Sequence, residues 1–137
     1  MKNSILMLIF FLYGSLILNA QNTIDVKIIN FASDEGVAQI GLFNAETSFL
    51  DKVYKGKKIK IKNQEAVAVF TNIPDGTYAI SVFHDKNEDE KLNTFLGIPT
   101  ENYAASNNAP SQFGPPKWKD AKFEVRNGEI VKQKISL

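Results

Sequence analysis

Runs of alternating apolar and polar residues recur along this chain and are separated by short clusters of turn-forming residues. Successive side chains of a β-strand point to opposite faces of a sheet, so each run predicts a strand with one buried face. About seven such runs with almost no helical period are typical of a β-sandwich. We therefore predict an all-β fold, a single antiparallel β-sandwich of about seven strands, at residues 23–30, 37–44, 57–62, 64–70, 78–83, 121–126 and 129–137.

Turn-forming residues predict how some of these strands are connected. Asn127 and Gly128 lie between two alternating runs, and Asn-Gly is the strongest short-range signal for a β-hairpin. The turn residues at 33–36 predict a hairpin between the first two strands in the same way. Pro74 fixes the φ of a turn corner and Gly76 tolerates positive φ, which together predict a chain reversal before the next strand.

The first 20 residues predict a secretory signal peptide, and residues 21–137 predict one domain. Lys2 precedes an apolar run at residues 5–18, and Ala20 provides a small residue at the cleavage site. The apolar run is short for a membrane span, although an uncleaved anchor is the alternative. We expect an exported protein with no membrane span after cleavage. Since the chain contains no cysteine, its stability must come from packing, with a metal ion as a further source.

The charges of the chain do not predict a nucleic-acid partner. The chain has 16 Lys and Arg against 15 Asp and Glu, and Lys2 belongs to the predicted signal peptide. The one basic cluster, at residues 52–62, is interleaved with Ile59 and Ile61, as in a strand with one solvated face. We expect no nucleic-acid binding.

Residues 84–116 form a long, polar segment without a clear apolar period. Loops of this length inside a compact domain are usually either functional or disordered. Disordered segments have few aromatic residues, whereas this one contains several large apolar residues and four prolines that restrict φ. We therefore predict one long ordered loop with five apolar anchors, namely Phe95, Leu96, Ile98, Tyr103 and Phe113.

The beginning of this loop predicts a calcium site. Ca²⁺ takes six to eight hard oxygen ligands, and alternating acidic and amide side chains bring several oxygens around one ion. Glu90 lies where the sharp turn of an EF-hand-like loop needs Gly, and Leu96 lies where a bidentate carboxylate is expected. A solvated acidic turn is therefore the alternative. The expected cation ligands are Asp85, Asn87, Asp89 and Asn93, with Glu101 completing the shell.

His84 is the only histidine, so every histidine-dependent mechanism would have to use it. A zinc site of the usual kind needs several nitrogen or sulfur ligands, which this chain lacks. We interpret His84 as an imidazole that closes the loop by hydrogen bonding a backbone carbonyl. A hydrolase built on His84 and Asp85 is a weaker alternative, because neighbouring residues of a strand point to opposite faces. Ser106 and Ser111 have no nucleophile elbow around them.

The second half of the loop offers a candidate ligand or partner surface. Amide side chains bond hydroxyl groups, and an indole ring provides a flat apolar face for a glycan or peptide. The competing interpretation is a self-capped loop, because Asn tolerates left-handed φ and bonds nearby backbone. The residues of this candidate surface are His84, Tyr103, Asn107, Asn108 and Trp118.

The chain also carries a family resemblance. The octapeptide YAISVFHD at 78–85 is followed by FLGIP at 95–99, Glu101, Tyr103, SNNA at 106–109 and FGPP at 113–116. In this layout the chain resembles the bacterial family of domain of unknown function 2141. The resemblance implies an exported protein of the periplasm or cell envelope of a Gram-negative bacterium, with no established activity. The turn at residues 70–83 resembles that of transthyretin-like (prealbumin-like) and carboxypeptidase-regulatory-like β-sandwich domains.

The family pattern differs from this chain at two loop positions. It has Gly in place of Glu90 and Asp in place of Asn93, and both differences lower the expected affinity for a cation. The leading hypothesis is a non-enzymatic exported β-sandwich whose loop at residues 84–116 is ordered by Ca²⁺ and presents a surface to an envelope protein or glycan. The alternative is a carbohydrate-binding or small-ligand-binding module, and a hydrolase is the third hypothesis.

Overall fold

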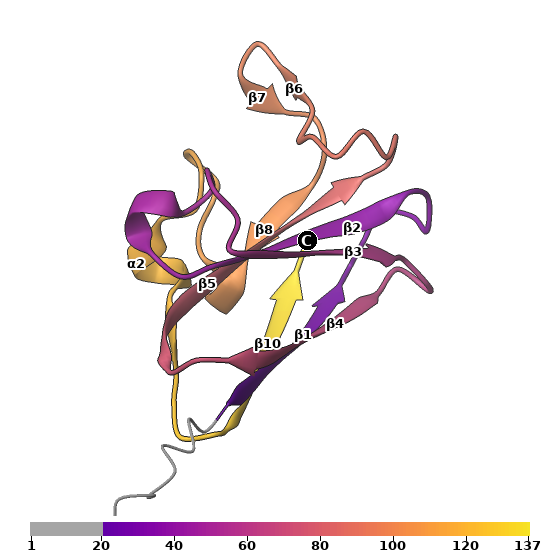
Figure 1. Ribbon diagram of the computed structural model, residues 1–137. Coiled ribbons are helices and arrows are strands. Elements are labelled where there is room, and N and C mark those ends of the chain that lie inside the picture. The colour runs from indigo at the N-terminus through magenta and orange to yellow at the C-terminus, as the bar shows by residue number, and fades with distance from the viewer. Residues whose placement is uncertain (1–20) are drawn as a thin grey trace, which may run out of the picture.

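The computed structural model describes residues 21–137, and the predicted signal peptide lies outside them. The described chain forms two packed β-sheets with a small hairpin that projects from one end (Figure 1). This arrangement confirms the predicted all-β sandwich. Among residues 21–137, no helix has the length and apolar character needed to cross a membrane.

The smaller sheet has three strands in the order β10-β1-β4. They are β10 (Ile130–Ser136), β1 (Asn22–Ile29) and β4 (Ala66–Ile73). β1 pairs with β4 in the antiparallel sense and with β10 in the parallel sense. The prediction of a purely antiparallel sandwich is therefore wrong for one pair, because the first and last strands lie side by side and run in the same direction.

The larger sheet has five strands, with β3-β2-β5-β8 as its main path and β9 paired with another part of β5. They are β3 (Lys55–Lys60), β2 (Val37–Phe43), β5 (Gly76–Asp85), β8 (Tyr103–Ala105) and β9 (Phe123–Val125). Two short strands, β6 (Thr94–Phe95) and β7 (Ile98–Pro99), form the separate hairpin. The helices within residues 21–137 are single turns, at η1 (Glu46–Ser48), η2 (Ser106–Asn108) and α2 (Trp118–Ala121).

The core lies between the two sheets, as the alternation predicts. Ile24, Val26 and Ile28 of β1 are fully buried, and they belong to one cluster with Ile80 and Val82 of β5. A second, smaller cluster covers the other face of the larger sheet. It consists of Ala79, Ala105, Ala109 and Ala121, with Phe49 and Trp118 packed against them.

Two of the predicted hairpins do not form. Asn127 and Gly128 both have positive φ, 61° and 68°, so the chain turns there as predicted. The strands on either side belong to different sheets, however, because β9 pairs with β5 and β10 pairs with β1. The turn at residues 33–36 likewise connects β1 of one sheet to β2 of the other. Turn chemistry identified the reversals but not the partner strands.

The long segment at residues 84–116 is ordered but is not one loop. It contains β6, β7, β8 and η2. Most of its predicted apolar anchors are wrong, because their side chains are exposed: Phe95 and Ile98 by 69%, Leu96 by 86% and Phe113 completely. Among the predicted anchors, Tyr103 alone is half-buried.

Candidate functional site

Asp85 is a buried residue at the point where the candidate loop begins. It ends β5 on the face opposite to the core and has no exposed surface. Its carboxylate accepts hydrogen bonds from the backbone N–H groups of Asp89 (3.2 Å) and Glu90 (2.9 Å), and from Gln39 Nε2 (3.1 Å). The preceding turn packs tightly against this strand end, since a Cβ added at Gly36 would overlap the carbonyl oxygen of Asp85. Asp85 therefore holds the loop and the neighbouring strand together.

Asp89 is the centre of the loop that follows. Its Oδ1 accepts from the backbone N–H of Lys91 (3.0 Å), and its Oδ2 accepts from Asn87 Nδ2 (3.2 Å). With its amide nitrogen turned toward Asp89, Asn93 donates to the same Oδ2 at 2.9 Å. Glu90 has a φ of 64°, in the left-handed region that favours glycine. The sequence correctly identified Glu90 as the position where the turn is sharp.

Glu101 closes the loop from its other end. Its Oε1 accepts from the backbone N–H of Lys86 (3.2 Å), and its Oε2 accepts from the backbone N–H of Asn93 (3.0 Å). The structure thus brings together all five predicted cation ligands through direct hydrogen bonds. Their oxygens accept from N–H donors of the protein, and within residues 21–137 no three acidic or histidine side chains form a group suited to hold a metal ion.

His84 lies in the interior rather than on a surface. Its side chain is 1% exposed, Nε2 lies 2.7 Å from the carbonyl oxygen of Glu35, and the ring meets Phe31 edge to face. Because a carbonyl only accepts, Nε2 carries the proton. Nδ1 is buried without a hydrogen-bond partner in the described part of the chain. The predicted bond from His84 to a backbone carbonyl is confirmed, but the carbonyl belongs to Glu35, in the turn between β1 and β2, and not to the long loop. The assignment of His84 to a ligand surface is wrong because the side chain is buried.

Asn107 and Asn108 join the loop to the rest of the sandwich. Asn107 Nδ2 donates to the carbonyl oxygens of Asp120 (3.2 Å) and Lys122 (2.9 Å), and Asn108 Oδ1 accepts from the backbone N–H of Ser136 (2.9 Å). Both residues have positive φ, as expected of Asn in a tight turn. Their amides are therefore engaged with the protein's own backbone.

The aromatic members of the predicted ligand surface are also engaged within the protein. Tyr103 Oη donates to the carbonyl oxygen of Ser111 at 3.3 Å. The indole of Trp118 packs at 5.6 Å from the ring of Phe49, with both rings against the smaller apolar cluster. The structure does not bring these side chains together with His84 into one open surface, because His84 faces the core.

Ser106 is a structural residue whose role the sequence did not predict. Its Oγ accepts from the backbone N–H of Ile80 (2.9 Å) and donates to the carbonyl oxygen of Ala121 (2.6 Å), and it has no exposed surface. β8 pairs with β5 at Ser81–Phe83 and β9 pairs with it at Gly76–Tyr78. Ser106 fills the interval between the two pairings, and a serine in a polar segment gives no local signal of such a role.

The projecting hairpin carries three neighbouring apolar side chains that are exposed to solvent. Thr94 pairs with Pro99 and Phe95 with Ile98, around a tight turn in which Leu96 and Gly97 have φ of 51° and 79°. Figure 1 shows this hairpin extending away from both sheets. Its side chains Phe95, Leu96 and Ile98 form what we call the apolar tip. The FLGIP motif contains the signal, since a two-residue turn with Gly lies between apolar residues.

The shifted pKa values lie at the start of β5, whereas the candidate loop follows its end. Burial raises the pKa of the Tyr78 phenol, and the charges of Tyr54 and Asp75 add to this effect. Tyr78 Oη donates to the carbonyl oxygen of Pro74 at 2.8 Å. The hydrogen bond from Arg126 lowers the pKa of Glu124, with a further contribution from Thr77.

The fold and the site together define a two-sheet β-sandwich with a hydrogen-bonded strand-end loop that carries an exposed apolar hairpin. The chain belongs to the family described as an uncharacterized protein conserved in bacteria (DUF2141), whose profile matches residues 26–133. The resemblance to this family that the sequence shows is thereby confirmed. No curated protein and no solved structure matches this chain.

Proposed function

We propose that this protein is an exported, non-enzymatic β-sandwich that binds a partner protein in the cell envelope through its apolar tip. The observation that carries the proposal is the exposure of Phe95, Leu96 and Ile98 on one hairpin. Contiguous exposed apolar side chains commonly mark interaction sites. Export is proposed from the sequence of residues 1–20, which lie outside the described residues.

The base of the hairpin supports this proposal because it is fixed by hydrogen bonds. Glu101 joins the two ends of the loop, and the backbone N–H of Thr100 donates to the carbonyl oxygen of Asn93 at 2.8 Å. A surface that is already ordered loses less conformational entropy on binding. The apolar tip is therefore suited to insert into a groove of a partner.

The absence of an acid–base pair at the site supports a non-enzymatic role. The Asp85 carboxylate accepts three hydrogen bonds on one face of β5, and His84 points into the core on the other. Ser106 bonds backbone groups of β5 and α2. A glycan-binding role has no specific observation in its favour, because the Asn107 and Asn108 amides are already used within the protein.

Crosslinking at the apolar tip tests the partner proposal. A photoreactive amino acid at position 96 should give one discrete protein adduct in cells, and the same group at exposed Lys60 on β3 should not. Replacing Phe95 and Ile98 by Ser should remove the adduct while the melting temperature stays unchanged. Adducts with lipid alone, or equal adducts from both positions, would contradict a protein partner at the tip.

We further propose that Ca²⁺ binds to the oxygens at the beginning of the loop, at residues 85–93. The proposal is supported by the linked oxygens of Asp85, Asn87, Asp89 and Asn93 and by the preference of Ca²⁺ for carboxylate and amide oxygen. A bound ion would take over oxygens that now accept from N–H donors. The ligand would stabilise the folded state by about 3 kcal/mol at a hundredfold excess over its dissociation constant.

Thermal unfolding in chelator and then in added Ca²⁺ tests this second proposal. The melting temperature should rise with Ca²⁺ concentration, and the rise should be absent in Asp89→Ala. Trp118→Ala is the matched control, because Trp118 packs away from the loop on Phe49 and its loss should leave the Ca²⁺ response intact. No shift across millimolar Ca²⁺ would mean that hydrogen bonds alone order the loop.

A further inference from the structure

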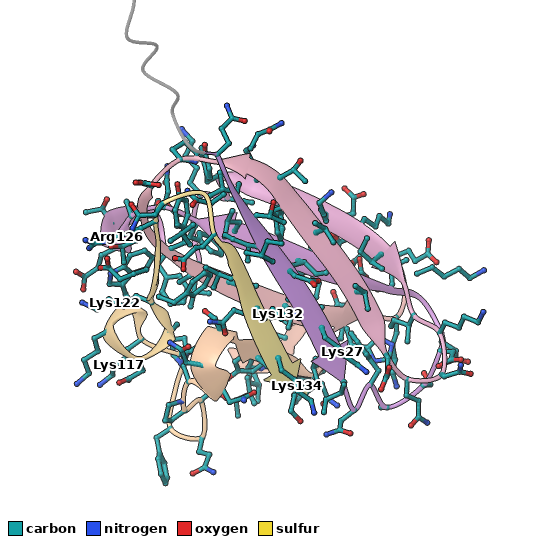
Figure 2. All side chains as sticks on the ribbon, turned by 90° about the horizontal axis from the view of Figure 1, so that it is seen from below. Lys27, Lys117, Lys122, Arg126, Lys132 and Lys134 are labelled. Atoms are coloured by element: carbon teal, nitrogen blue, oxygen red, sulfur yellow. The ribbon has the colours of Figure 1, made fainter. Side chains whose placement is uncertain are left out.

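The edge strands of the two sheets differ in how they are protected. An unpaired strand edge is a template for another chain, and charged side chains are a common means of blocking it. β3 has the sequence KGKKIK, and Figure 2 shows Lys132 and Lys134 along β10. Asn108 also covers part of the β10 edge. β4 has the sequence AVAVFTNI, with no charged residue and no proline, so its edge lacks this protection.

The backbone groups on the free side of β4 follow from the register. The N–H of Thr23 donates to the carbonyl of Glu129, and the carbonyl of Ile29 accepts from the N–H of Leu137. The backbone N–H and C=O groups of odd-numbered residues of β1 therefore point toward β10, and those of even-numbered residues point toward β4. From Ala66 to Phe70 the even-numbered residues of β4 therefore bond β1. Beyond Phe70 the register shifts at a bulge, where Asn72 has a φ of 58°, and Ile73 pairs with Asn22. The backbone groups of Val67, Val69 and Thr71 point outward, and no hydrogen bond to them is found within residues 21–137.

The region beside this edge is open and basic. Lys62 and Glu65 bridge β3 and β4 at a tight turn, after which the two strands diverge into different sheets. The divergence leaves a cavity of about 350 Å³ lined by Lys55, Gly56, Lys57, Phe70 and Thr71. Nζ of Lys57 lies 5.6 Å from the centre of the Phe70 ring.

The lysines of this opening are available to an acidic ligand. Lys58 makes an ion pair with Glu90, on the outer side of β3. Among the described residues, no ion pair involves Lys55 or Lys57. A strand added to β4 would direct alternate side chains into this opening and the others outward beside Val67 and Val69, which are 54% and 42% exposed.

We propose that the free edge of β4 and the lysine-lined opening beside it bind an extended acidic peptide segment of a partner protein. The segment pairs with β4 as an added antiparallel strand. Main-chain hydrogen bonds to Val67, Val69 and Thr71 supply affinity, and the alternating side chains supply specificity. Every second side chain of the peptide is a carboxylate that points toward Lys55 and Lys57. The side chains between them are β-branched and lie beside Val67 and Val69. This site is separate from the apolar tip and does not depend on the function proposed for it.

A labelled heptapeptide of alternating Val and Glu, with blocked ends, is the probe for fluorescence anisotropy. It should bind the protein, and a peptide with Lys in place of every Glu should not. Lys57→Glu should weaken binding by about tenfold because it reverses a charge in the opening. Lys119→Glu is the control, because Lys119 is exposed on α2 and does not line the opening, and it should change affinity less than about twofold.

Val69→Pro tests the strand pairing itself. The Val69 N–H faces the free edge, so proline removes a donor to the peptide without removing a bond to β1. Binding should be lost in this variant. A peptide N-methylated at the residues that face β4 should fail in the same way with the unaltered protein, whether or not the variant folds.

Three results would overturn the proposal. The acidic peptide fails to bind the folded protein, or its binding survives N-methylation, which would indicate adsorption to lysines without strand pairing. The third result is a dimer in sedimentation that the N-methylated peptide does not dissociate but that the Val69→Pro substitution does. This would mean that a second copy of the chain occupies the edge.

Discussion

The two halves of the long segment after β5 are built in opposite ways. Residues 86–101 take most of their hydrogen bonds from one another and carry the apolar tip away from the sandwich. Residues 102–121 are instead joined to β5 through Ser106 and to β10 through Asn108. Ser106 and Asn107 also bond the backbone carbonyls of Ala121 and Lys122. The first half projects from the domain, whereas the second half is packed into it.

The two halves therefore contribute differently to folding, although Phe113 of the second half is exposed as well. The second half places small residues, Ala105 and Ala109, against the sheet and satisfies its backbone with buried or tethered polar groups. The first half leaves its largest apolar side chains in solvent, where they contribute little to folding. Mutations of the buried polar residue that joins the second half to the sandwich should therefore destabilise the protein, whereas mutations at the tip should change only what it binds.

Ser106→Ala should have the largest effect on stability. It leaves the backbone N–H of Ile80 and the carbonyl of Ala121 buried without a partner. We expect the free energy of unfolding to fall by about 3 kcal/mol, measured by urea denaturation. Ser111→Ala is the control, because Ser111 contributes its carbonyl to Tyr103 and this bond does not need the hydroxyl. An equal loss in both variants would contradict the role assigned to Ser106.

Asp85→Ala should have an intermediate effect, confined largely to the first half. The three donors to its carboxylate lose their acceptor, but those in the exposed loop reach water more readily than Ile80 does. We expect a loss of about 2 kcal/mol. Hydrogen exchange should accelerate at Asp89 and Glu90 while Ile80 stays protected. Faster exchange throughout β5 would mean that the two halves do not unfold separately.

Replacement of Leu96 by Ser should have the smallest effect. Its side chain is 86% exposed, so the free energy of unfolding should change by less than about 0.5 kcal/mol. The same change should remove the crosslinked adduct of a photoreactive group placed next to it, at position 95. A stability loss of the size expected for Asp85→Ala would show that the tip is packed against the sandwich in solution.

Local patterns predicted the strands well, because alternation follows from the pleat of a strand itself. Ile24, Val26 and Ile28 alternate in the sequence and are all buried in the structure. The pairing of strands could not be predicted in the same way. Asn127 and Gly128 make the expected turn, but which strand β10 joins depends on packing against β1, more than 100 residues away.

The candidate site was predicted in part for a related reason. The alternating oxygens from Asp85 to Asn93 lie in one loop, so their proximity could be inferred from spacing. The exposure of Phe95 could not, because an apolar residue in a short hairpin has the same local pattern whether the hairpin is covered or free. Ser106 acts through Ile80 and Ala121, which are 26 and 15 residues away, and no local pattern records such contacts.

The parallel pairing of β1 with β10 has a consequence for the order of folding. Asn22 and Glu129 share a hydrogen bond although they are 107 residues apart, so the first strand gains one of its two neighbours only when the last strand is present. Closing so large a loop is entropically unfavourable and slow. In a chain that is synthesised or transported with its N-terminus first, β1 would have only β4 as a neighbour until β10 follows. If the chain is exported as proposed, β1 would acquire its second neighbour only after the C-terminal strand has also crossed the membrane.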